Sequence, residues 1–135
     1  MRWFIAAALS SAWSSVAAED LRPGRYQVAV EITLPNIDTS DYDFQTEICW
    51  RGTSAPGMPL GPMGPGPLRD CPSVVSDTTD GLLVETICEG PNAGWAVSIY
   101  HPTPTGFKGR IDMNMGGKNM RVGEIQRARW LGPCG

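Results

Sequence analysis

The sequence is poor in the residues that most often carry chemistry. Its 135 residues contain a single histidine, and 11 basic residues stand against 14 acidic ones. One histidine offers no framework for a hydrolase that pairs serine or cysteine with histidine. The formal net charge of −3 argues against nucleic acid, because phosphate binding needs a basic face. We therefore expect no catalytic residues, no cofactor and no nucleic-acid partner.

Long apolar runs are also missing, since no stretch approaches the ~20 residues that span a bilayer. The first segment has Arg2 as its only charge, then an apolar run over 3–9, then Ser-rich residues that end in Val16-Ala17-Ala18. This order is typical of a secretory signal peptide. We predict a signal peptide over 1–18 and a single domain over 19–135. That domain would be periplasmic or secreted, with no membrane span.

The cysteines lack the short C-x2-C spacing of zinc and redox motifs. All four follow the predicted signal peptide, and an even count in an exported chain indicates two disulfides. A hairpin over 72–88, with its turn between residues 79 and 80, places Cys71 opposite Cys88 within disulfide reach. We therefore predict Cys71–Cys88, which leaves Cys49–Cys134 as the second bridge.

Helical periodicity is absent after residue 18, and alternation of apolar and polar residues takes its place. The clearest case runs from Gly24 to Leu34, where every second residue from Tyr26 is apolar. Such alternation indicates a strand with one face on a core. The predicted strands cover 24–34, 44–50, 73–75, 82–88, 95–99, 107–115 and 120–130. About seven strands predict an all-β fold, an antiparallel meander closed as a small barrel or folded as a curved sheet or sandwich.

Two of the connections between the predicted strands are rich in glycine. Residues 51–70 hold five prolines and five glycines and predict a long loop, either functional or flexible. The Gly116-Gly117 pair predicts a two-residue hairpin turn that sets Met113 opposite Met120. Beyond it, the alternation slips near Gly123-Glu124, which suggests a β-bulge.

Several short motifs occur in a fixed order along the chain. They are Pro23-Gly24-x-Tyr26, then Cys49, Cys71 and Cys88, then Met113-x-Met115-Gly116-Gly117-x-x-Met120, and finally Arg129-x-Leu131-Gly132-x-Cys134. The set resembles an exported bacterial family known as domain of unknown function 3617, over nearly all of residues 19–135. The resemblance implies a location in the Gram-negative envelope and supplies no activity. Tyr26 stands where that family more often has tryptophan.

The methionines are candidate metal ligands, because soft thioethers select Cu(I). The candidates are Met58 and Met63 in the Pro/Gly loop and Met113, Met115 and Met120 around the late hairpin. The alternative is that the late-hairpin group fills a core as adaptable apolar side chains. Met113 and Met120 share a face with other apolar residues, which favours that alternative.

The strand aromatics are candidate ligand-binding residues. Tyr26, Trp50 and Trp95 would line the mouth of a barrel and hold an apolar ligand, or form the core itself. Arg127 and Arg129, with Arg121, form a modest basic strand edge. We expect a non-enzymatic binding or interaction module whose partner is a protein or a small apolar ligand. The alternative is a periplasmic Cu(I)-binding protein.

Overall fold

The computed structural model describes residues 21–53, 58–90, 93–115 and 120–135. The predicted signal peptide lies outside these residues. The strands are β1 (Gly24–Thr33), β2 (Phe44–Trp50), β3 (Ser73–Thr78), β4 (Gly81–Cys88), β5 (Gly94–Pro102), β6 (Gly106–Met115) and β7 (Met120–Gly132). Two short 3-10 helices, η2 (Ser40–Tyr42) and η3 (Pro67–Asp70), lie in the connections. The predicted all-β class is confirmed.

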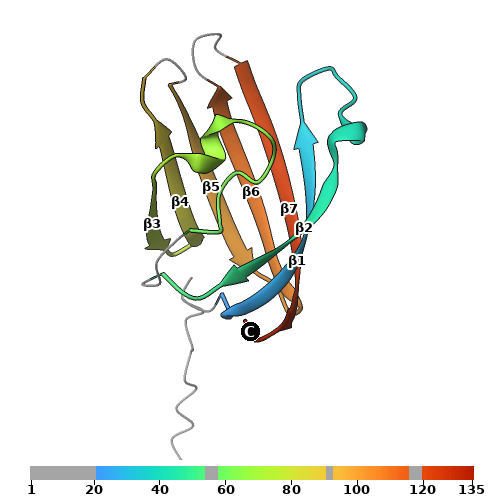
Figure 1. Ribbon diagram of the computed structural model, residues 1–135, viewed down its shortest axis with the longest axis vertical. Coiled ribbons are helices and arrows are strands. Elements are labelled where there is room, and N and C mark those ends of the chain that lie inside the picture. The colour runs from blue at the N-terminus through green and yellow to red at the C-terminus, as the bar shows by residue number, and fades with distance from the viewer. Residues whose placement is uncertain (1–20, 54–57, 91–92, 116–119) are drawn as a thin grey trace, which may run out of the picture.

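The seven strands form one antiparallel sheet in the order β2-β1-β7-β6-β5-β4-β3. Strands β3 to β7 follow one another as a meander, and the β1–β2 hairpin adds to the free side of β7 (Figure 1). Because β2 and β3 are the two edges, the sheet is not closed as a barrel. Of the predicted alternatives, the structure shows the curved sheet.

The two faces of the sheet differ in what covers them. Residues 58–72, which we call the strap, cross one face in front of the sheet, and η3 within them contacts β4 and β5 (Figure 1). We call this the inner face. Leu60 of the strap joins Tyr26, Tyr100 and Phe107 in the main core cluster. Among the residues described here, no element covers the opposite, outer face.

The aromatic side chains of the main cluster fix how β1, β5 and β6 pack. The ring centroid of Phe107 lies 4.9 Å from that of Tyr26 and 5.3 Å from that of Tyr100. Tilted and edge-on contacts at these distances are the favoured arrangement of aromatic pairs. A second, smaller cluster joins Leu68 of η3 to Ile111 and Met113 of β6. The strap therefore contributes one leucine to each cluster.

The register of the late hairpin corrects two predictions. Met113 pairs with Val122 and Met115 with Met120, so the predicted pairing of Met113 with Met120 is wrong by two residues. The pairing continues without interruption through Gly123 and Glu124, so the predicted bulge there is also wrong. The register shift of β7 instead faces Arg25/Tyr26 of β1, at the far end of the strand. Strand β7 thus keeps its alternation and turns Glu124 toward the core.

Both predicted disulfides are confirmed. Cys71–Cys88 joins the end of the strap to β4, with Cα atoms 5.3 Å apart. Cys49–Cys134 joins β2 to the segment after β7, with Cα atoms 5.9 Å apart. One bridge therefore holds the strap and the other holds the last residues of the chain. No helix in the described ranges is long and apolar enough to cross a membrane.

Candidate functional site

Two polar side chains of β7 lie fully buried on the inner face, where apolar residues would be expected. Glu124 and Gln126 are both 0% exposed. Burying a carboxylate is costly unless hydrogen bonds compensate it. Glu124 accepts two from the strap, since the amide of Met63 lies 3.0 Å from Oε2 and that of Gly64 lies 2.9 Å from Oε1. A third hydrogen bond comes from the Gln126 side-chain amide.

Gln126 extends this network to β5 and to the start of the strap. Its Nε2 donates to the Gly61 carbonyl at 2.8 Å, and the Tyr100 hydroxyl donates to its Oε1 at 2.8 Å. The Gly61 amide in turn donates to the Tyr100 oxygen at 2.7 Å. Burial raises the pKa of Tyr100 well above its ordinary value, so the hydroxyl keeps its proton and can donate. We call Glu124, Gln126 and Tyr100 the polar triad.

The triad explains why a segment so rich in proline and glycine has a defined path. Such a segment has few amides to donate and forms no regular ladder, yet a buried backbone N–H needs an acceptor. The side chains of the triad supply acceptors for the amides of Gly61, Met63 and Gly64. A Cβ on Gly64 would lie 2.8 Å from Ile32 Cδ1 and 3.0 Å from Glu124 Oε1. Any larger residue at position 64 would therefore displace the end of the Ile32 side chain and crowd the Glu124 carboxylate, so glycine allows the close approach of the strap to β7.

An apolar cavity of about 140 Å³ lies beside the triad, between the strap, β1 and the ends of β6 and β7. Its described lining includes Ile32, Leu34, Tyr42, Pro62, Gly64, Leu68, Arg69, Met113, Val122 and Glu124. Most of these side chains are apolar, and Arg69 is an exposed charged residue beside them. An apolar hollow with a few polar groups is the usual character of a small-ligand site.

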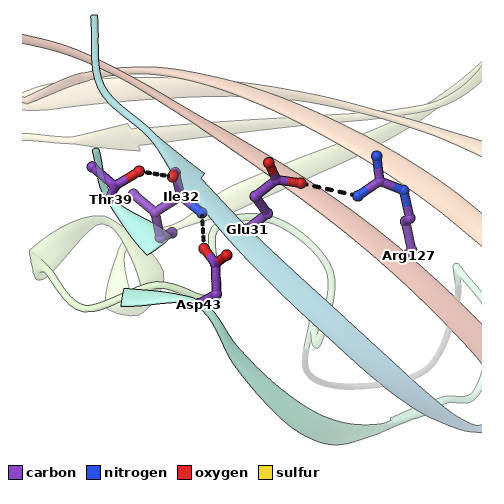
Figure 2. A network of polar contacts seen from close by, with 5 residues as sticks. All are labelled: Glu31, Ile32, Thr39, Asp43 and Arg127. Atoms are coloured by element: carbon purple, nitrogen blue, oxygen red, sulfur yellow. Dashed lines mark hydrogen bonds and ion pairs between the residues drawn. The ribbon is translucent and has the colours of Figure 1, made fainter. Parts of the chain in front are cut away.

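The connection between β1 and β2 forms one wall of this cavity and is braced against β1. The Thr39 hydroxyl donates to the Ile32 carbonyl, and the Ile32 amide donates to Asp43 Oδ1 at 3.3 Å (Figure 2). These two hydrogen bonds hold the connection at the end of β1. Leu34 and Tyr42, which line the cavity, are thereby placed opposite the strap.

The three aromatic candidates lie in different places. Tyr26 and Trp50 are 1% and 2% exposed, and their polar atoms donate to the carbonyls of Arg22 and Leu21. They hold the segment before β1 and do not line the cavity. Trp95 lies on the outer face of β5 and is 40% exposed. The structure therefore brings none of the three to the apolar cavity.

The methionine candidates are spread over several environments. Met58 and Met63 pack against the main core cluster, whereas Met113 belongs to the second cluster. Met113 also lines the apolar cavity, and Met120 is exposed at the start of β7. The side chain of Met115 lies outside what the structure describes. Within the described ranges, no group of three His, Cys, Asp or Glu side chains is placed to hold a metal ion.

Sequence reasoning missed the triad, although a signal for it exists. Glu124 and Gln126 are spaced two apart, in phase with Val122 and Ala128 on the inner face. The predicted slip in the alternation is wrong, because the pattern marks buried polar residues in an unbroken strand. Their partners in the strap lie 60 to 65 residues away along the chain, so no local pattern reveals them.

In comparisons with family models, curated proteins and solved structures, the chain matches none.

Proposed function

We propose that the protein is an exported, non-enzymatic binding module that takes a small apolar group into the cavity beside the polar triad. The observation that carries the proposal is the apolar cavity itself, closed on one side by the strap. The two disulfides support an oxidising compartment outside the cytoplasm, in keeping with the predicted signal peptide and the envelope location implied by domain of unknown function 3617.

The size of the cavity sets the size of its occupant. About 140 Å³ is close to the engineered apolar cavities that hold benzene or xenon. The occupant is therefore one aromatic ring or one branched aliphatic group. Ile32, Leu68 and Val122 supply apolar contacts on three sides, and the disulfide after η3 limits how far the strap moves away from them. A wall of this kind favours binding because little ordering is needed when the ligand enters.

The test is a titration of the purified protein with benzene and with xenon, followed by backbone amide and ¹²⁹Xe NMR. We expect saturable shifts confined to residues around the cavity. Val122→Phe places a larger side chain in the cavity and abolishes these shifts. Val97→Phe makes the same exchange on the outer face of β5 and leaves them unchanged. Absence of saturable shifts in the wild-type protein would overturn the proposal.

Cu(I) binding remains a second prediction, with its own test. Met113 lines the cavity, while Met58 and Met63 pack with the main core cluster. Titration of the reduced metal-free protein with Cu(I) against a competing chelator measures the affinity directly. Uptake that is lost in Met113→Leu would support a thioether site, and no uptake against the chelator would end the copper proposal.

A further inference from the structure

The outer face carries an accumulation of positive charge that the apolar cavity does not explain. Lys108 of β6 and Arg127 of β7 are directly opposite one another, and Arg129 follows two residues later. Like charges directly opposite on a sheet repel each other. The chain as a whole has a net charge of −3, so this cluster runs against the overall balance. An arrangement of this kind is stabilised when an anion lies between the cations.

The three basic side chains surround a hollow of about 480 Å³. Ala29 of β1 also lines the hollow, and its small side chain lies between Arg127 on one neighbouring strand and Gln45 on the other. Longer side chains around a single alanine leave a depression in the otherwise charged surface. A hollow of this volume falls within the range of small-ligand clefts.

The polar contacts around Ala29 use only some of the N–H donors of the two arginines. Arg127 Nη1 lies 3.0 Å from Glu31 Oε2, and the exposed pair is drawn in Figure 2. Arg129 Nη2 donates to Gln27 Oε1 at 3.1 Å, and Gln27 Nε2 donates to Gln45 Oε1 at 3.1 Å. A guanidinium has five N–H donors, so both arginines keep several for another acceptor.

The charges around the hollow do not cancel. Among the described residues, Glu31 is the one carboxylate that forms an ion pair with any of the three cations, and its partner is Arg127. For Lys108 and Arg129 the described part of the chain shows no ion pair with a carboxylate. Thr103 and Thr105, in the connection before β6, add hydroxyl groups at the rim. Arginine, lysine and hydroxyl donors together are the usual set for a phosphoryl oxyanion.

We propose that this hollow, around Ala29, binds the phosphoryl group of an organic phosphate. The same chemistry is offered by a soluble phosphate ester and by the headgroup of an anionic phospholipid. The site is on the outer face, whereas the apolar cavity is on the inner face. The proposal is therefore independent of the function proposed above.

The experiment uses the purified full-length protein and two probes, glycerol 3-phosphate and vesicles of phosphatidylglycerol in phosphatidylcholine. Amide NMR shifts measure binding of glycerol 3-phosphate, and cosedimentation measures binding to the vesicles. We expect saturable binding to at least one probe, with a Kd of about 1 mM or tighter for the ester. Binding to the ester alone indicates a soluble ligand, and binding to vesicles alone indicates a headgroup. Binding to both assigns the shared phosphoryl chemistry to the hollow.

Three variants separate a built site from general attraction. Lys108→Gln removes a cation from the hollow and should weaken binding about tenfold. Arg110→Gln removes one positive charge from the same face of the same strand, beside Asp112 and outside the hollow, and should weaken binding less than twofold. Ala29→Leu keeps every charge and fills the floor, so it should abolish binding of the ester.

Two results would overturn the proposal. One is that neither probe binds the wild-type protein saturably. The other is that Lys108→Gln and Arg110→Gln reduce binding equally while Ala29→Leu has no effect, because then only the overall charge attracts the anion. Thermal unfolding of each variant, measured beside the wild type, shows that the fold is intact before binding is compared.

Discussion

At the scale of single residues, Glu124 is the side chain on which the path of the strap most depends. Its carboxylate accepts hydrogen bonds from two strap amides and from Gln126, and it is fully buried. Glu124→Gln replaces one acceptor oxygen by an amide group that donates, so a donor then faces a donor. We expect the free energy of unfolding to fall by about 2–3 kcal/mol. Urea unfolding of the two proteins measures the change.

The control for this substitution is Glu85→Gln on β4. Glu85 is exposed on the outer face, and the same chemical exchange there should change stability by less than about 0.5 kcal/mol. Equal effects at the two sites would mean that the hydrogen bonds of Glu124 to the strap do not contribute to the free energy of unfolding. A larger loss at Glu124 supports the triad as the anchor.

The raised pKa of Tyr100 should make the stability of the protein fall at alkaline pH. Burial raises its pKa above the usual value near 10, so the folded protein retains a proton that the unfolded chain releases. The stability that this difference confers is full below pH ~10 and is lost as the pH rises further. The loss from this phenol approaches about 1.4 kcal/mol per pH unit.

Urea unfolding at several pH values from 9 to 11 tests this dependence, with Tyr100→Phe as the comparison. The variant lacks the phenol, so its free energy of unfolding should fall less steeply over the same range. Tyr26, whose pKa burial also raises, remains in both proteins and contributes equally. Parallel curves for the two proteins would contradict the assignment.

At the scale of elements, the contact between β5 and β6 depends on a missing side chain. Gly109 pairs with Tyr100, and a Cβ there would lie 2.5 Å from Tyr100 Cε1. Gly109→Ala therefore pushes the ring away from the position in which its hydroxyl reaches Gln126 and Gly61. We expect the free energy of unfolding to fall by about 1–3 kcal/mol, as measured by thermal unfolding.

Gly135→Ala is the matched control, since a Cβ at the last residue meets no atom within 4 Å. Its stability should equal that of the wild type within about 0.5 kcal/mol. If Gly109→Ala were as stable as Gly135→Ala, the ring of Tyr100 would have room to move, and the triad would not be rigidly placed.

The elements also show what the sequence could and could not predict. Strands β1 and β2 follow directly from alternation, because their apolar residues face one core. The predicted turn between β3 and β4 is also confirmed, since Thr78 pairs with Gly81. The prediction for the late hairpin is wrong. A Gly-Gly pair favours a two-residue turn, whereas the observed pairing joins Met115 to Met120.

The apolar series of β5 faces the opposite way to the triad. Trp95 and Ile99 lie on the outer face, whereas Ala96, Ser98 and Tyr100 are buried on the inner one. Alternation alone gives the period of a strand and does not say which side is covered. The side is decided by the strap, whose contacts with β5 and β7 depend on hydrogen bonds between distant residues. The candidate site is therefore the part of the molecule that periodicity could not reveal.

At the scale of the whole molecule, the disulfides should supply much of the stability of this small sheet. The bridge between Cys49 and Cys134 has a sequence separation of 85, and that between Cys71 and Cys88 has one of 17. The chain-entropy model gives about 4.5 and about 3 kcal/mol, respectively. Paired Cys→Ala variants, compared by urea unfolding, test this order.

The two bridges should also differ in what they hold. Loss of Cys71–Cys88 frees the end of the strap, so it should weaken binding of benzene in the cavity. Loss of Cys49–Cys134 acts at the other end of the sheet and should lower stability while binding in the remaining folded protein is kept. The opposite pattern would show that the strap is held without its own bridge.

Native-state hydrogen exchange at the amides of Met63 and Gly64 tests most directly whether the strap is a fixed wall. Both amides donate to Glu124, so we expect them to exchange only in large opening events, with protection close to that of the β1 and β7 core amides. Exchange at the rate of an unstructured peptide would contradict the account, because a strap that opens freely encloses no cavity.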